Sequence, residues 1–234
     1  MKRILNYFSK GEIILWLFEI TLIITFFCIF DRKEILNLIA SLIGVTALIF
    51  CAKGNPIGQA LVIAFSAIYG IISFGFAYYG EMLTYLGMTA PMALISLISW
   101  VKHPNGDNRS EVKIRSLKKL DIVIMIPSTI AITVLFYFIL RAFGTANLFT
   151  STLSVTTSFS AAFLAYKRSP YYALAYILND IVLIVLWSFA AFKSISYLSV
   201  IICFVAFFIN DVYTFINWKK MQIKQRNSTA SDYT

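Results

Sequence analysis

Two asparagine–aspartate pairs interrupt long apolar runs in the C-terminal half of this chain of 234 residues. Asn179 and Asp180 form the first pair, and Asn210 and Asp211 form the second. Polar groups inside a membrane helix are costly and usually face the bundle interior or a water-filled path. An amide group both donates and accepts hydrogen bonds, so it suits a hydroxyl or carboxamide group of a solute. We predict that Asn179 and Asn210 contact such a solute, and hydrogen bonding between helices is the alternative.

The aspartates of these pairs suit a different chemistry. Asp180 and Asp211 could each offset a positive charge on the solute. Asp211 could instead lie near the end of its helix and form an ion pair with Lys219 or Lys220. A third acidic residue inside an apolar run, Glu19, lies near the N-terminus, and we expect it to lie outside the solute site.

Aromatic side chains accompany both pairs. Trp187 lies two helical turns after the first pair, where its ring could stack on a flat aromatic cation or anchor the helix at the membrane surface. Tyr213 lies one turn after the second asparagine and could reach the solute or pack in the core. Trp100 and Trp218 lie near lysines at the ends of apolar runs. That position favours surface anchors, with Trp100 kept as a candidate solute contact.

Hydroxyl groups and a proline complete the candidates. The run 150–158 is rich in serine and threonine, and Thr157 lies one helical turn past Ser154. These hydroxyls could line a polar path or allow close helix packing. Pro91 lies inside an apolar run, where it permits a kink that could be a hinge or static.

The composition places the chain in a membrane. Hydrophobic residues make up 59% and charged residues 13%, whereas soluble domains carry about 25% charged residues. One soluble core could not bury so much apolar surface. The net charge of +9 does not indicate nucleic-acid binding, because the basic residues lie between the apolar runs. Cys28, Cys51 and Cys203 are far apart, so we expect neither a disulfide nor a metal site.

Eight apolar runs approach the length of about 20 residues that crosses a membrane as a helix. The positive-inside rule tests this number. With eight spans, 16 of the 20 lysines and arginines fall on the side of both termini. We therefore predict an all-α protein of the cell membrane with both termini in the cytoplasm. The predicted spans are 13–30, 35–52, 57–79, 82–101, 121–143, 148–166, 170–192 and 196–218.

An internal repeat relates the two halves of the chain. Pro56 and Pro170 each open a helix after a polar turn, at an offset of 114 residues. Two further matches follow in the same order, the second between 99–102 and 217–220. An odd linker helix between two three-helix units makes the repeat parallel, which is a transporter architecture. We predict an N-terminal segment with an extra helix (1–34), a first three-helix repeat (35–102), a cytoplasmic loop with the linker helix (103–143), a second three-helix repeat (144–218) and a polar cytoplasmic tail (219–234).

This plan resembles a known family. The 3+1+3 order, the tryptophan that closes each unit and the segments SPYYALAYILNDIVLIVLW (169–187) and INDVYTFINW (209–218) are similar to PnuC nicotinamide riboside transporters over about 35–220. The resemblance implies a duplicated SWEET-like fold and a homotrimer. It also implies facilitated diffusion of nicotinamide riboside, driven by phosphorylation inside the cell, with Asp180 and Asp211 offsetting the charge of the nicotinamide ring.

One departure from the family pattern concerns the substrate. Members often carry Trp-x-x-Trp at the end of the first unit, where this chain reads Leu97-Ile98-Ser99-Trp100. Related transporters carry thiamine or riboflavin, so the vitamin stays open. Many members have seven helices, and the helix at 13–30 is additional.

Other function classes lack support in the sequence. The single histidine, His103, lies at the edge of the polar loop, and HExxH, GxSxG and Walker motifs are missing. We therefore expect neither an enzyme nor a cofactor. No basic cluster is embedded in the apolar runs, which suits a nucleoside better than a nucleotide. A binding subunit of a larger uptake complex is the remaining alternative. We predict transport by rocking of one three-helix unit against the other.

Overall fold

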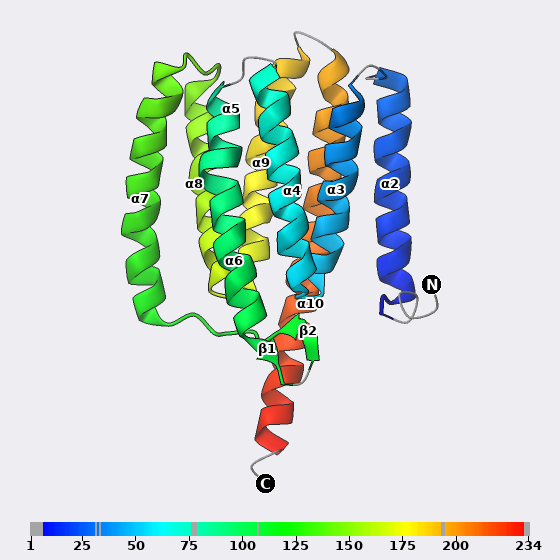
Figure 1. The fold of residues 1–234 in the computed structure, drawn as a ribbon, viewed down its shortest axis with the longest axis vertical. Helices are drawn as coiled ribbons and strands as arrows, with labels where there is room; N and C mark the ends of the chain where they lie inside the picture. Colours follow the sequence, from blue (N-terminus) through cyan, green and yellow to red (C-terminus); the bar gives the residue numbers. More distant parts are fainter. Residues whose placement is uncertain are drawn as a thin grey trace.

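The computed structural model describes residues 7–30, 32, 34–75, 79–106, 108–192 and 195–231. Within this part of the chain, eight helical segments are long and apolar enough to span a membrane, which confirms the predicted number. They stand side by side in one bundle (Figure 1). The segments are α2 (Lys10–Phe30), α3 (Ile35–Ala52), α4 (Pro56–Gly75), the composite span α5, η1 and α6 (Tyr79–Thr84, Tyr85–Thr89 and Ala90–Lys102), α7 (Lys119–Ala142), α8 (Leu148–Tyr166), α9 (Tyr171–Ala191) and α10 (Leu198–Ser231).

A short hairpin marks one end of the bundle, which we call the hairpin end. Its strands, β1 (Pro104–Asn105) and β2 (Asn108–Val112), pair antiparallel directly after α6. Helix α2 begins and α10 ends at this same end (Figure 1). The polar tail predicted after residue 218 is in fact a continuation of α10 as far as Ser231. It packs on the hairpin, because Gln225 Nε2 donates to the carbonyl of Val112 at 3.1 Å.

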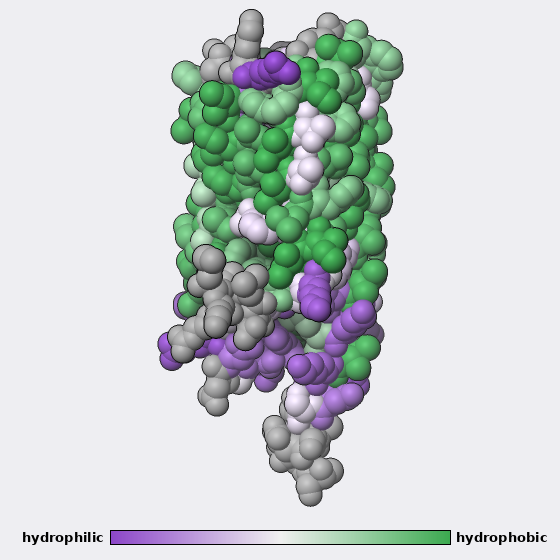
Figure 2. All heavy atoms as spheres, turned by 90° about the vertical axis from the view of Figure 1, so that its right-hand side faces the viewer, coloured by the Kyte–Doolittle hydropathy of each residue, from purple (hydrophilic) through white to green (hydrophobic). Residues whose placement is uncertain are grey.

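The outer surface of the bundle is apolar along most of its length. On the face that carries α2, Figure 2 shows a band of hydrophobic residues above the hydrophilic hairpin end. Large apolar side chains point outward elsewhere too, for example Val123 on α7 and Phe149 on α8, which are 63% and 81% exposed. Such a surface suits lipid, where apolar groups need no cover from water. It agrees with the membrane class predicted from the composition.

The helices of the two predicted three-helix units pack on each other reciprocally. Helix α3 packs on α10, and α6 packs on α8. The first helix of each unit therefore lies against the third helix of the other, as a parallel repeat about a central axis requires. Helices α2 and α7 stand at opposite edges of the bundle (Figure 1).

A π-helical turn precedes Pro91 in the composite span. Residues Tyr85–Thr89 form this turn, and the hydroxyl of Thr89 donates to the carbonyl of Thr84 at 3.2 Å. Proline lacks a backbone N–H and its ring crowds the preceding turn. A wider π turn accommodates that crowding, and such turns are frequent at functional sites. The kink predicted at Pro91 therefore takes the form of a π turn, which carries Tyr85 into the bundle interior.

Candidate functional site

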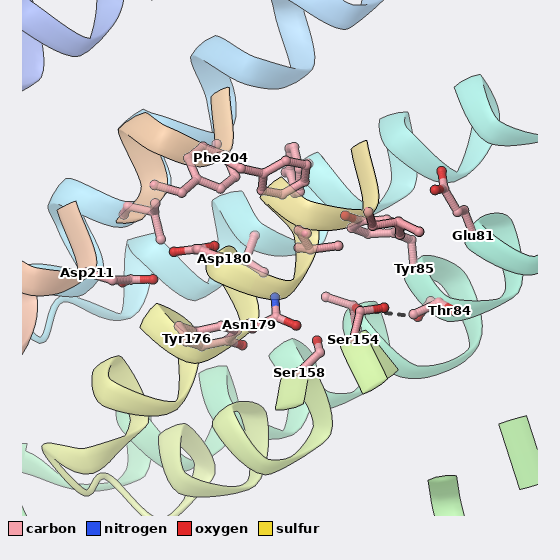
Figure 3. A pocket seen from close by; sticks show the side chains of 18 of the residues that line it. Glu81, Thr84, Tyr85, Ser154, Ser158, Tyr176, Asn179, Asp180, Phe204 and Asp211 are labelled. Atoms are coloured by element: carbon pink, nitrogen blue, oxygen red, sulfur yellow. Dashed lines mark hydrogen bonds between the residues drawn. The ribbon is translucent and has the colours of Figure 1, made fainter. Parts of the chain in front are cut away.

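A cavity lies among the helices of both units. Residues of α3, α4, α5, η1, α8, α9 and α10 line it, and its empty volume, including space open to solvent, is about 1140 Å³. Polar side chains reach into it from several helices (Figure 3). They include Gln59, Glu81, Thr84, Tyr85, Ser154, Ser158, Tyr176, Asn179, Asp180 and Asp211.

Four of the predicted solute contacts line this cavity, and three of them lie on α9. Asn179, Asp180 and Trp187 share one face of this helix, and Asp211 joins them from α10. The predicted Thr157 lies behind this wall, where its hydroxyl donates to Asn179 Oδ1 at 2.9 Å. That bond occupies the amide oxygen and leaves the two N–H donors of Asn179 for a ligand.

Asn210 and Tyr213 point away from the cavity, toward α2. Asn210 Nδ2 donates to Glu19 Oε2 at 3.0 Å, and the Tyr213 hydroxyl donates to Glu12 Oε1 at 2.8 Å. The prediction that these two residues contact a solute is corrected accordingly. They hold the extra helix against α10, and hydrogen bonding between helices was the alternative stated for Asn210. Glu19 contacts Asn210 rather than the cavity, in line with its predicted place outside the site.

Three aromatic rings close the cavity at the hairpin end. Tyr172 lines the floor of the cavity, and Trp100 and Trp218 pack against it, with both tryptophans fully buried. The Trp218 indole and the Tyr172 hydroxyl donate to the carbonyl of Cys51 at 2.9 and 3.2 Å. The Trp100 indole donates to the carbonyl of Ala165 at 2.8 Å. The prediction of surface anchors, and of Trp100 as a direct solute contact, is therefore corrected: both tryptophans are core residues beneath the floor.

Among the described residues that line the cavity, all those of a charged type are acidic. Glu81, Asp180 and Asp211 line it, and none of the described lining residues is lysine, arginine or histidine. Asp180 and Asp211 point toward each other (Figure 3) at the wall of the cavity. The alternative ion pair of Asp211 with Lys219 is not formed, because the Lys219 ammonium lies over the ring of Tyr171, 4.0 Å from its centroid.

Sequence reasoning missed several lining residues, among them Glu81, Tyr85 and Tyr176. Glu81 falls just before the predicted span 82–101, so the sequence placed it outside the membrane. Tyr176 lies one helical turn before Asp180, and this spacing could have assigned it to the same face of α9. The orientation of Tyr85 depends on the π turn, for which the sequence carries no specific signal beyond Pro91.

Comparison with known proteins places this chain among transporters. A family model described as nicotinamide mononucleotide transporter matches residues 34–220. The chain belongs to this family. The nicotinamide riboside transporter PnuC of Neisseria mucosa is 25% identical over 197 residues, which cover 82% of this chain and 75% of that protein. The crystal structure of a vitamin B3 transporter PnuC has a TM-score of 0.79 and 24% identity, over 93% of this chain and 94% of the other.

Family membership confirms the resemblance drawn from the segments around Asn179 and Asn210. It makes the chain a multi-pass membrane transporter and not an enzyme, as predicted. The structural match shows that the eight-helix fold is shared with a solved transporter.

Proposed function

We propose that this chain carries nicotinamide riboside into the cell by facilitated diffusion, and that phosphorylation inside the cell removes the free substrate. The observation that carries this proposal is the cavity, whose described lining residues include acids and aromatic rings but no basic side chain. Nicotinamide riboside joins a flat, positively charged pyridinium ring to a ribose. Acidic groups balance that charge, and aromatic faces attract such a ring. The name of the Neisseria relative supports the same substrate.

The lining favours a nucleoside over the nucleotide that the family description names. A phosphate group needs positively charged partners or clustered N–H donors. The described residues that line the cavity supply no basic side chain for a phosphate. The carboxylates tolerate a ribose hydroxyl and favour a cationic ring.

Each side of the cavity has a role in this proposal. The free N–H donors of Asn179 meet a ribose hydroxyl or the carboxamide oxygen of the substrate. Asp180 and Asp211 balance the charge of the ring. Trp187 and Tyr85 supply aromatic faces, and each is held by a neighbouring ring: Trp187 by Tyr197 and Tyr85 by Tyr69, with centroids 5.5 and 4.5 Å apart.

The distribution of basic residues supports an orientation of the bundle in the membrane. We place the hairpin end in the cytoplasm, since lysine and arginine gather on that side of the predicted spans. The floor of Trp100, Tyr172 and Trp218 then separates the cavity from the cytoplasm. Release into the cell requires one three-helix unit to rock against the other. This motion breaks the hydrogen bonds by which Trp100 and Trp218 join the two units. We retain the homotrimer implied by the family, which the mass of the detergent-solubilised complex tests.

Thermal unfolding of the purified protein tests the substrate. Nicotinamide riboside, nicotinamide mononucleotide, thiamine and riboflavin are compared, because a ligand that binds only the folded state raises Tm as its concentration rises. We expect nicotinamide riboside to raise Tm and Asn179→Ala to reduce this effect. Asn108→Ala, in the exposed hairpin, is the matched control and should keep the full shift.

The other outcomes point to the alternatives. A shift with thiamine or riboflavin instead would retain the transporter and change the substrate. No shift with any of the four compounds would contradict the proposal and favour a binding subunit of a larger uptake complex.

A further inference from the structure

Two turns at the hairpin end correspond to each other in the two halves of the chain. The α3–α4 turn contains Gly54 and the α8–α9 turn contains Arg168, at the same offset of 114 residues that relates the prolines after them. Both residues have a left-handed backbone, with φ of 65° and 57°. Both carbonyl oxygens accept a backbone hydrogen bond from the segment 112–115. Val112 N donates to Gly54 O at 2.9 Å, and Arg115 N donates to Arg168 O at 3.0 Å.

The second turn carries an arginine where the first carries a glycine. A left-handed backbone is costly for a residue with a Cβ atom, and glycine is the usual residue at this position after a helix. Gly54 follows that rule, and a Cβ atom there would also lie 3.1 Å from Val112 Cγ1. Arg168 departs from it, and its Nε atom is buried without a hydrogen-bond partner among the described residues. An unpartnered guanidinium nitrogen at a strained position indicates a ligand that the chain itself does not supply.

Three positively charged side chains and one carboxylate gather at this turn. Arg115 Nη2 and Lys167 Nζ contact the two oxygens of Asp121 at 2.8 and 3.3 Å. Together with Arg168, these groups leave two positive charges that no carboxylate in the cluster balances. Burial, and then the nearby charge of Arg115, lowers the pKa of the Arg168 guanidinium. A bound anion would offset this repulsion.

The turn lies at the level where lipid headgroups meet the bundle. Helix α7 begins, α8 ends and α9 begins at this end (Figure 1). Exposed apolar side chains follow directly on the membrane side, at Leu120 and Val123 on α7 and at Tyr171, Leu174 and Leu178 on α9. The proposed orientation places this end in the cytoplasm. The cytoplasmic leaflet carries anionic lipids, and basic pockets between helices on this side bind their headgroups.

We infer that Arg168, together with Arg115 and Lys167, binds the phosphate of an anionic phospholipid. A guanidinium group can donate two parallel hydrogen bonds to phosphate oxygens, and the ammonium group adds a further charge. The acyl chains lie along the exposed side of α9, which begins three residues after Arg168. The bound lipid holds the α8–α9 turn against the loop that precedes α7. This site is separate from the cavity and does not depend on the substrate proposed for it.

Thermal unfolding of the full chain in a mild detergent tests the lipid site. Phosphatidylglycerol, phosphatidylcholine and glycerol phosphate are each added at rising concentration, because a ligand of the folded state raises Tm. Phosphatidylglycerol combines a net negative charge with acyl chains. Phosphatidylcholine has a neutral headgroup, and glycerol phosphate has no acyl chains. We expect phosphatidylglycerol to raise Tm at concentrations at which the other two have no effect.

Arg168→Gly separates lipid binding from folding. Glycine suits the left-handed backbone, so the variant without lipid should unfold at the same Tm or at a higher one. Its half-maximal response should require about tenfold more phosphatidylglycerol, in keeping with the loss of a charge-assisted hydrogen bond. Arg168→Gln keeps a side chain and removes the charge, and it should show the same loss. Lys224→Gln removes one charge from the exposed continuation of α10 and should keep the full response.

Each contrary outcome overturns a stated part of the inference. A full response in Arg168→Gly, or an equal loss in Lys224→Gln, would overturn the assignment to this turn. A lower Tm of Arg168→Gly without lipid would show that Arg168 already has a stabilising partner in the chain. An equal shift with phosphatidylcholine would overturn the selection for negative charge, and an equal shift with glycerol phosphate would overturn a lipid as the source of the phosphate. None of these results would alter the test of the substrate in the cavity.

Discussion

Trp100 and Trp218 pack against each other beneath the cavity, with ring centroids 5.2 Å apart. Each indole N–H crosses to the first helix of the other unit. Trp100 donates to the carbonyl of Ala165 on α8 at 2.8 Å, and Trp218 donates to the carbonyl of Cys51 on α3 at 2.9 Å. The two bonds are reciprocal, because each tryptophan lies at the end of one predicted three-helix unit and donates to the first helix of the other.

The residue before each tryptophan also donates a hydrogen bond to the first helix of the other unit. Ser99 Oγ donates to the carbonyl of Tyr166 at 2.9 Å, and Asn217 Nδ2 donates to the carbonyl of Ala52 at 2.8 Å. Together with the bond from the Tyr172 hydroxyl to the carbonyl of Cys51, five hydrogen bonds among the described residues join the two units at the hairpin end. Because rocking of the units would break them together, they stabilise the state in which the floor of the cavity is closed.

Replacement of Trp218 by phenylalanine should loosen this floor. The variant keeps an aromatic ring and loses the donor to Cys51, and a hydrogen bond of about 1 kcal/mol changes an equilibrium about fivefold. Cys51 lines the cavity directly above the floor, so its thiol reports opening. With Cys28 and Cys203 replaced by serine, we expect a membrane-impermeant thiol reagent on the cytoplasmic side to label Cys51 about fivefold faster in Trp218→Phe.

Trp16→Phe is the matched control for this measurement. The indole of Trp16 also makes one hydrogen bond between helices, to Thr46 Oγ1 at 3.2 Å, but it lies on α2 and outside the floor. Labelling of Cys51 should stay unchanged in this variant. Equal acceleration in both variants would show that the floor tryptophans have no special part in opening.

Loss of the Thr157 hydroxyl should weaken substrate binding without removing any residue that lines the cavity. In Thr157→Val the shape is retained, but Asn179 loses the donor that orients its amide. We expect the Kd for nicotinamide riboside to rise about fivefold, in keeping with one hydrogen bond. Thr157→Ser, which restores a hydroxyl, should recover most of the affinity in a calorimetric titration.

The neighbouring Thr156 provides the control for Thr157. Its hydroxyl lies 2.9 Å from Thr133 Oγ1 on α7 and so faces away from Asn179. Thr156→Val should leave the Kd unchanged. A similar loss of affinity in both valine variants would mean that the effect arises from packing of α8 and not from the amide of Asn179.

The sequence was sufficient to predict the number of spans and the polar residues of α9 that line one wall of the cavity, because both depend on local patterns. Hydropathy and basic residues repeat along the chain at the scale of a helix, and Asn179, Asp180 and Trp187 share a face of one helix. Contacts between distant segments left no such pattern. Asn210 meets Glu19, which lies 191 residues away, and Trp218 meets Cys51, 167 residues away. Periodicity shows that a polar side chain faces inward, but not which partner it meets there.

The contact of Glu19 with Asn210 should contribute to stability rather than to the substrate site. In Glu19→Leu, the buried amide of Asn210 loses its partner on α2, and we expect a loss of about 1 kcal/mol in the free energy of unfolding. Glu19→Gln keeps an acceptor and should cost less. A double-mutant cycle with Asn210→Leu, measured by unfolding in mixed detergent, gives the coupling energy. Strictly additive losses would contradict a direct contact.

Gly58, where α4 lies close to the backbone of α3, should not tolerate a side chain. A Cβ atom there would lie 2.6 Å from the backbone nitrogen of Cys51 and 2.9 Å from the carbonyl oxygen of Ala47. Backbone atoms cannot turn aside as a flexible side chain can, so Gly58→Ala must push the helices apart, at a cost of about 1–3 kcal/mol. The same substitution at Gly87, where a Cβ would meet nothing within 4 Å, should not lower Tm. Because Cys51 accepts the bond from Trp218, Gly58→Ala should also speed cytoplasmic labelling of Cys51; a Tm equal to that of Gly87→Ala would contradict the close packing of α3 and α4.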